Sequence, residues 1–214
     1  MKLDRIGSIV ALLALSPFTS GQQMTEHDMS AHSMGMSMGH EHGASVAQVT
    51  YEELTRTATQ LEAARRATAK YQDVRVAEAD GYHAMGPDVR GMGIHYVGSH
   101  SSPFDVEHPD ILLYEKNAQG PGGLSLVGVS YLFRAETDSD GQPKNPPFPK
   151  SLASWHRHTN LCVFPDRSVK GDLNETQCVA QGGRFNALTQ WMVHAWIWKD
   201  SPAGVFSPTN PTVN

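Results

Sequence analysis

The tract from Gln22 to Gly43 constrains the fold of this chain most, because it cannot contribute to a hydrophobic core. It reads QQMTEHDMSAHSMGMSMGHEHG and contains no large aliphatic or aromatic residue. A segment of this composition buries too little apolar surface to offset the loss of chain entropy, so we expect it to be disordered without a ligand. The folded part must therefore follow it, and we predict a single domain over residues 50–214.

The N-terminus has the pattern of a signal peptide. Lys2 and Arg5 precede an apolar stretch over residues 6–18, which is shorter than the roughly 20 residues that span a bilayer. We predict a signal peptide over residues 1–21, followed by a tail over residues 22–49; the alternative is an uncleaved membrane anchor. No later stretch is apolar enough to span a membrane, so we expect a periplasmic or secreted protein without stable membrane insertion after cleavage.

The cysteines and the charge narrow the function further. Cys162 and Cys178 are the only cysteines, and in an oxidising compartment such a pair more often forms a disulfide than a metal site. Closing this loop would contribute about 3 kcal/mol in the chain-entropy model. The net charge is −5 without a basic patch, which argues against nucleic acid as a partner and is compatible with metal ions.

A helix is predicted at the start of the domain. Thr50 and Glu53 form a capping box, and apolar residues follow at helical spacing as far as Ala79. The pattern predicts a helix from about Tyr51 to Ala79, with a break near Lys70 as an option.

The rest of the domain has the pattern of short strands between turns. The β-like runs, bounded by Gly, Pro and Asp, cover residues 93–97, 111–115, 124–133 and 154–164. A short helix is expected over 172–180, and a last helix over 187–198 is favoured, although Trp191, Val193 and Ala195 also alternate as in a strand. The predicted fold class is α+β: a long N-terminal helix, then a small mainly antiparallel sheet with one or two further helices.

The tail is rich in residue types that bind metal ions. It contains five methionines and four histidines, namely Met24, Met29, Met34, Met36, Met38, His27, His32, His40 and His42. Thioether sulfur favours Cu(I), whereas imidazole suits Cu(II) and zinc, so the mixture favours copper, with zinc or another divalent metal as the alternative. The competing interpretation is a low-complexity linker.

Within the domain, the strongest candidate site is the sequence Trp155-His156-Arg157-His158. In a strand, alternate residues share one face and lie about 7 Å apart, so His156 and His158 could share an ion. His194 and His95 are the candidates for a further ligand, because each lies in an apolar segment where an unsatisfied imidazole is costly. The alternative is that each histidine is bonded to a carbonyl and is structural.

Two resemblances add to these patterns. The stretch MTEHDMSAHSMGMSMGHEH resembles the Met/His-rich segments of periplasmic copper- and silver-resistance proteins. The motifs GMGIHYV, WHRH and HAWIW resemble those of a group of exported bacterial proteins, which implies one coherent domain and supplies no mechanism.

Three hypotheses for function follow. The first is an exported protein that binds a transition metal, copper by preference, for sequestration or delivery. The second is a metal-dependent enzyme in which three histidines leave a coordination position for a substrate. The third is a structural exported domain with no bound metal.

Overall fold

The computed structural model describes residues 49–99 and 103–214. The predicted signal peptide and the histidines and methionines of the tail lie outside the described residues. Among the described residues, no helix is long and apolar enough to cross a membrane.

The N-terminal helical region is shorter than the sequence pattern predicts. Helix α1 covers Tyr51–Thr68, and its capping box between Thr50 and Glu53 is present. A 3-10 turn, η1 (Ala69–Gln72), and a separate short helix, α2 (Val74–Ala79), follow it. The chain breaks between them because Asp73 adopts an extended conformation and its side chain accepts a hydrogen bond from the backbone of Arg75, which starts a new helix.

The prediction of a long N-terminal helix is therefore wrong, and the domain is mostly sheet. The main sheet has five antiparallel strands in the order β1-β2-β3-β4-β8. These strands are β1 (His83–Val89), β2 (Gly93–Val97), β3 (Ile111–Lys116), β4 (Leu124–Phe133) and β8 (Trp191–Ala195). Three of them were expected from their β-like runs, whereas β1 was missed.

The predicted last helix is also wrong, because its residues form β8. Every residue of β8 is buried, and its side chains divide between the two faces of the sheet: Val193 and Ala195 join one hydrophobic cluster and Met192 joins the other. Pairing with β4 satisfies its backbone groups. The alternation seen in the sequence was thus the true signal, and tertiary pairing outweighs helix propensity here.

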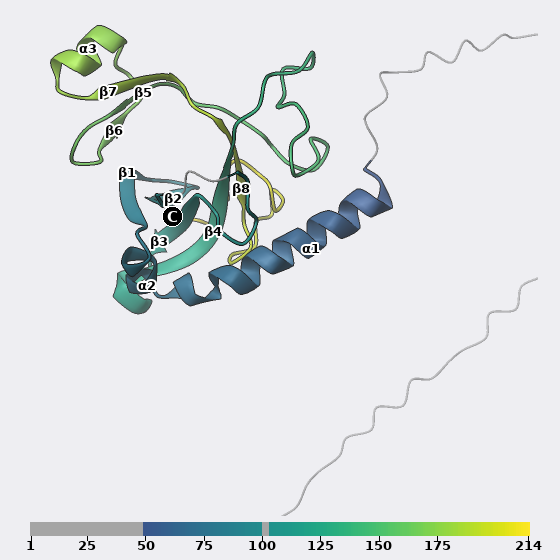
Figure 1. Cartoon of the computed structure of the whole chain (residues 1–214). Helices are drawn as coiled ribbons and strands as arrows, with labels where there is room; N and C mark the ends of the chain where they lie inside the picture. The colour runs from purple at the N-terminus through teal and green to yellow at the C-terminus, as the bar shows by residue number, and fades with distance from the viewer. Residues whose placement is uncertain (1–48, 100–102) are drawn as a thin grey trace, which may run out of the picture. The chain divides into compact units, whose positions relative to one another are not determined.

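A second, three-stranded sheet extends from the first. Its order is β6-β5-β7, with β5 at Thr159–Val163, β6 at Val169–Lys170 and β7 at Arg184–Leu188. Helix α3 (Glu175–Ala180) lies at its end (Figure 1). The predicted disulfide between Cys162 and Cys178 is confirmed and ties α3 to β5; it is consistent with an exported protein.

The main sheet has two different faces. One face packs against α1, η1 and α2 through the larger hydrophobic cluster, which contains Ala64, Tyr71 and Val74 together with Leu112 and Val129. The other face carries a smaller cluster of six buried residues: Ile111, Leu113, Val127, Met192, Trp196 and Val213. We call these the helix face and the histidine face, because the second also carries His95 and His194.

The sheet is curled around its histidine face. Strands β2 and β8 are three steps apart, about 14 Å in a flat sheet, yet the ring centroids of His95 and His194 are only 5.8 Å apart. The residues of β4 that pair toward them on this face are Gly128, over which the ring of Trp196 packs, and Ser130. Figure 1 shows β4 as a long, bent strand along the middle of the domain.

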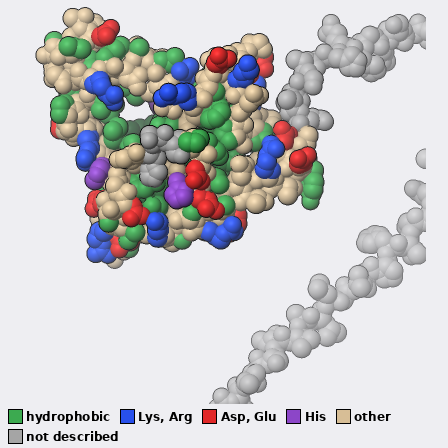
Figure 2. Space-filling model, in the orientation of Figure 1, with side chains coloured by type: hydrophobic (Ala, Val, Ile, Leu, Met, Phe, Trp, Pro, Cys, Tyr) green, Lys and Arg blue, Asp and Glu red, His purple; other side chains and the backbone are tan. Residues whose placement is uncertain are grey.

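The face of the domain seen in Figure 2 carries charges of both signs. In the view of Figure 2, basic and acidic side chains are interspersed, and the surface is hollowed between the part that carries the second sheet and the body of the domain.

Candidate metal centre

Four histidines from distant parts of the sequence come together at the edge of the main sheet. We call His95, His156, His158 and His194 the four-histidine cluster. The ring centroid of His156 lies 5.3 Å from that of His158 and 5.1 Å from that of His194, and His95 lies 5.8 Å from His194. These are the four residues that the sequence singled out within the domain.

Strand pairing places each ring. His95 is in β2 and His194 is in β8. His156 forms an isolated bridge with Met192, with two backbone hydrogen bonds of 2.8 and 2.9 Å, so it extends the main sheet beyond β8. His158 is held by Thr189, whose hydroxyl accepts from its backbone N–H at 2.9 Å. The cluster therefore joins the main sheet to the segment that leads into β5.

The ring of His194 is oriented by the C-terminal segment. Its Nδ1 lies 2.7 Å from the carbonyl oxygen of Pro208. A carbonyl only accepts hydrogen bonds, so Nδ1 carries the proton and Nε2 of the neutral ring has a free lone pair. The Nε2 atom is buried and has no hydrogen-bond partner among the described residues.

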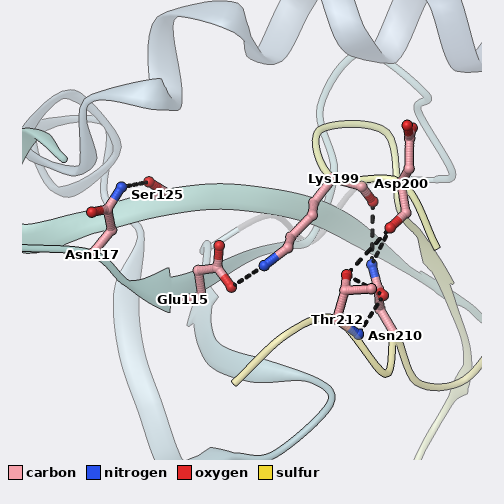
Figure 3. Close-up of polar contacts among 7 residues, drawn as sticks. All are labelled: Glu115, Asn117, Ser125, Lys199, Asp200, Asn210 and Thr212. Atoms are coloured by element: carbon pink, nitrogen blue, oxygen red, sulfur yellow. Dashed lines mark hydrogen bonds and ion pairs between the residues drawn. The ribbon is translucent and has the colours of Figure 1, made fainter. Parts of the chain in front are cut away.

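A polar network fixes the C-terminal segment that holds Pro208. The side-chain amide of Asn210 donates to the carbonyl oxygens of Lys199 and Asp200, each at 3.2 Å (Figure 3). The hydroxyl of Thr212 donates to the side-chain oxygen of Asn210 at 2.7 Å, and Lys199 forms an ion pair of 2.6 Å with Glu115. Asn210 is fully buried, so the network anchors this segment on the histidine face.

The other rings have similar supports. His156 places Nδ1 3.1 Å from the carbonyl oxygen of Ser154, which leaves its Nε2 as the acceptor atom. His95 has a hydrogen bond with the backbone of Gly93. Ligating histidines in proteins commonly donate the other ring nitrogen to a carbonyl in this way, which fixes the tautomer and the direction of the free lone pair.

The cluster favours neutral imidazoles. Burial, together with the neighbouring His95 and His156, lowers the pKa of His194 to about 3. Burial lowers the pKa of His95 to about 4 in the same way, with His158 as the largest neighbouring contribution. Burial and His156 also lower the pKa of His158. Metal binding requires a deprotonated ring nitrogen, so no proton has to be removed from these residues near neutral pH.

The spacing of neighbouring rings is that of imidazoles that share an ion, but the donor atoms do not converge. In residues 49–99 and 103–214, no group of three His, Cys, Asp or Glu side chains has its donor atoms arranged to hold a metal. The distances of 5.3, 5.1 and 5.8 Å link the rings in the order His158, His156, His194 and His95, and each is near the spacing of about 5.2 Å between two imidazoles bound to one tetrahedral ion.

Two residues near the cluster were not recognised as part of a site. Ser130 of β4 pairs directly with His194, is fully buried, and has a hydroxyl without a partner in the described part of the chain. Met192 pairs with His156 and is buried. A serine inside the apolar run of residues 124–133 was the available signal, because an unpaired buried hydroxyl costs about 1–3 kcal/mol.

A groove borders the cluster without containing it. It has a volume of about 490 Å³ and lies between α1 and residues 203–208. No histidine lines it, but Ser154 and Pro208 do, and their carbonyls orient His156 and His194. The groove therefore borders the residues that orient two of the imidazoles, and no imidazole lines it.

Comparison of the chain with family models, with curated proteins and with solved structures finds no significant match, so its function has to be inferred from the residues of the site.

Proposed function

We propose that this chain is an exported transition-metal-binding protein that holds one ion, copper by preference, at the four-histidine cluster, for sequestration or delivery. The observation that carries the proposal is the environment of the two ring nitrogens of His194. Its Nδ1 donates a hydrogen bond to the carbonyl oxygen of Pro208. Its buried Nε2 has no hydrogen-bond partner among the described residues and lies beside two further imidazoles.

A purely structural role explains this arrangement poorly. A buried imidazole that serves only packing would be expected to have both ring nitrogens satisfied, because each unpaired buried polar atom costs about 1–3 kcal/mol. Contact among several buried imidazoles also penalises protonation, as the pKa values of His95 and His194 show. A metal ion would satisfy the free lone pairs together, and its binding energy would offset the cost of gathering them.

The surroundings of the cluster favour copper over zinc. Met85 of β1 pairs with His95 and Met192 pairs with His156, and cross-strand partners share a face of the sheet, so a thioether flanks the cluster on two sides. Both cysteines are in the disulfide, so neither offers a thiolate ligand. No carboxylate contributes to the pKa shifts of His95, His158 and His194. Imidazole with thioether suits both oxidation states of copper. The tail composition favours the same metal.

A metal-dependent enzyme is the second candidate. His156 and His158 are only half-buried, in contrast to His194. An ion bound there would be reached from the side of these two residues, and a site with an exchangeable position is typical of catalytic metals.

The stoichiometry of copper in the full chain tests the proposal. The untagged protein would be purified from the periplasm, loaded with excess Cu(II), dialysed, and subjected to elemental analysis. His194→Asn removes Nε2 but keeps an amide that can donate to Pro208, so it should fold. His108→Asn is the matched control, since His108 is exposed and paired with Asp105 away from the cluster.

We expect the wild-type protein and His108→Asn to bind one more copper ion per chain than His194→Asn. Copper bound by the tail would be common to all three and would cancel. Equal stoichiometry in the wild-type protein and His194→Asn would contradict the proposal.

A further inference from the structure

A pocket at the end of β4 contains two arginines and no acidic side chain. It has a volume of about 180 Å³, and its lining is made of residues 133–135, Arg157 and residues 188–191. Both charged side chains of this lining, Arg134 and Arg157, are cations. The other lining residues include the apolar side chains of Phe133, Ala135 and Leu188. The pocket therefore combines positive charge with an apolar wall.

Arg157 lies between His156 and His158 in the sequence but is not part of the four-histidine cluster. Its Nε donates to the carbonyl oxygen of Thr189 at 2.8 Å, and its guanidinium carbon lies 5.1 Å from the centre of the Trp191 ring. These two contacts fix the guanidinium and leave its two Nη nitrogens without a hydrogen bond among the described residues. Trp191 belongs to the hydrophobic cluster of the helix face, so Arg157 points away from the imidazoles.

Neither arginine of the pocket has a carboxylate partner in the described part of the chain. The ion pairs found there involve other basic residues. Arg157 is half-buried, and a cation that loses part of its water without gaining a counter-charge costs free energy. The chain has 22 acidic residues against 17 basic ones, so carboxylates are not scarce. An anion from outside the chain would supply the missing charge.

Trp191, which lines the same pocket, has an unused hydrogen-bond donor. It is 5% exposed, and its buried Nε1 has no acceptor among the described residues. The other three tryptophans each donate to an acceptor in the chain at 2.8–3.1 Å: Trp155 to Phe148, Trp196 to Ser207 and Trp198 to Thr68. An indole N–H can only donate. The tryptophan that contacts Arg157 is therefore the one that lacks an acceptor in the described residues.

We propose that this pocket binds a small organic carboxylate, independently of the proposed metal site. The two oxygens of a carboxylate match the two free Nη donors of Arg157 as a bidentate pair, and Arg134 adds a second positive charge. Phe133 and Leu188 would contact the apolar part of the ligand, which an inorganic anion does not have. A volume of about 180 Å³ is smaller than the roughly 300–1,000 Å³ of pockets for drug-sized ligands, so the ligand is small.

Benzoate is the probe for this pocket, and benzyl alcohol, which has the ring without the charge, is the matched control ligand. The ¹⁵N-labelled full chain would be titrated at constant ionic strength, and the indole N–H resonances would be followed by NMR. Trp191→Phe assigns the resonance of Trp191. Arg157→Gln and Arg134→Gln each remove one charge from the pocket, whereas Arg56→Gln removes a charge from an exposed position of α1 and is the control variant.

We expect benzoate to shift the Trp191 resonance with the same affinity in the wild-type protein and in Arg56→Gln, and benzyl alcohol to leave it unchanged. Arg157→Gln should weaken benzoate binding by at least about tenfold, the effect of losing hydrogen bonds to a charged group. Arg134→Gln should weaken it by about two- to fivefold, because this charge is exposed. Arg134 has no hydrogen bond or ion pair among the described residues, so its variant should fold even if Arg157→Gln does not.

Three results would overturn the inference. The first is the absence of benzoate binding in the wild-type protein, and the second is equal binding of benzyl alcohol, which would mean that the charge is not recognised. The third is equal benzoate affinity in Arg134→Gln and Arg56→Gln. Inorganic phosphate would be titrated as a further probe, and a higher affinity for phosphate than for benzoate would overturn the choice of an organic carboxylate.

Discussion

The two faces of the main sheet bury polar groups in different ways. On the helix face, the hydroxyl of Tyr114 donates to the carbonyl oxygen of Tyr71 at 2.6 Å, and that of Tyr131 donates to Val106 at 2.8 Å. On the histidine face, His194 Nε2 and Ser130 Oγ are buried without a partner in the described residues. The two tyrosine hydroxyls thus have partners within the fold. His194 Nε2 and Ser130 Oγ have none among the described residues, and Trp191 Nε1 of the helix face also has none there.

This difference suggests that the satisfied polar groups serve stability, whereas the unsatisfied groups of the cluster serve the proposed function. Polar groups that are satisfied within the chain hold the elements together, and their loss should weaken the fold alone. Polar groups without a partner lower the stability of the fold, and under the proposed function a bound metal would offset that cost. The following predictions test this division.

The largest expected effect is the response of the metal-free protein to acid. The pKa values of His95 and His194 are lowered to about 4 and about 3, against about 6.5 in the unfolded chain. The unfolded state therefore takes up protons that the folded state does not, so the contribution to stability is complete above pH 6.5 and is lost as the pH falls from 6.5 to about 3. The loss should be several kcal/mol in total, at about 1.4 kcal/mol per pKa unit.

Urea unfolding at a series of pH values would measure this dependence. His194→Asn should flatten the curve between pH 6.5 and 4, because one buried titratable ring is gone. An equal slope in the wild-type protein and the variant would mean that His194 does not contribute to the acid sensitivity.

Metal binding should have the next largest effect on the histidine face. A ligand that binds only the folded state at a thousand times its dissociation constant stabilises by about 4.1 kcal/mol. Copper at that excess, at pH 7, should raise the free energy of unfolding by this amount in the wild-type protein and by much less in His194→Asn. A similar rise in the free energy of unfolding in the wild-type protein and in His194→Asn would mean that copper binds through residues other than His194.

A smaller effect is expected from a change on the helix face. Tyr114→Phe removes the hydrogen bond to the buried carbonyl of Tyr71, so the free energy of unfolding should fall by about 1–2 kcal/mol. Copper affinity and stoichiometry should not change, since the hydroxyl points away from the cluster. A loss of copper together with this mutation would show that the two faces are not independent.

The smallest predicted effect concerns the choice of metal. Met85→Leu keeps the volume of the side chain next to His95 but removes the soft sulfur. The affinity for Cu(I) should fall by about three- to tenfold, whereas the affinity for Zn(II) should be unaltered. Met92→Leu, in the turn between β1 and β2, is the control. Equal Cu(I) affinity for both variants would remove the thioether from the argument for copper.

The sequence predicted local features better than long-range ones. The capping box at Thr50, the run of β4 and the disulfide were all visible as patterns over a few residues or as a matter of compartment. The length of the first helix was overestimated, because apolar spacing continues through Asp73 although the backbone does not.

The site was only partly visible in the sequence for a similar reason. His156 and His158 were paired by their spacing, and His194 and His95 were chosen for their apolar surroundings. Nothing local indicated that the sheet curls and brings β2 near β8, since that depends on long-range pairing. The contact of Pro208 with His194 and the pairing of Ser130 with His194 depend on long-range register and could not be predicted from neighbouring residues.

The most direct test of the copper site is the position of the metal itself. Crystals of the protein grown with copper would be measured on both sides of the copper absorption edge, and an anomalous difference map would be calculated. We predict one peak within about 2.0–2.1 Å of ring nitrogens from at least three of the four histidines, His194 Nε2 among them. Well-ordered rings of His95, His156 and His194 with no anomalous peak between them would contradict the account.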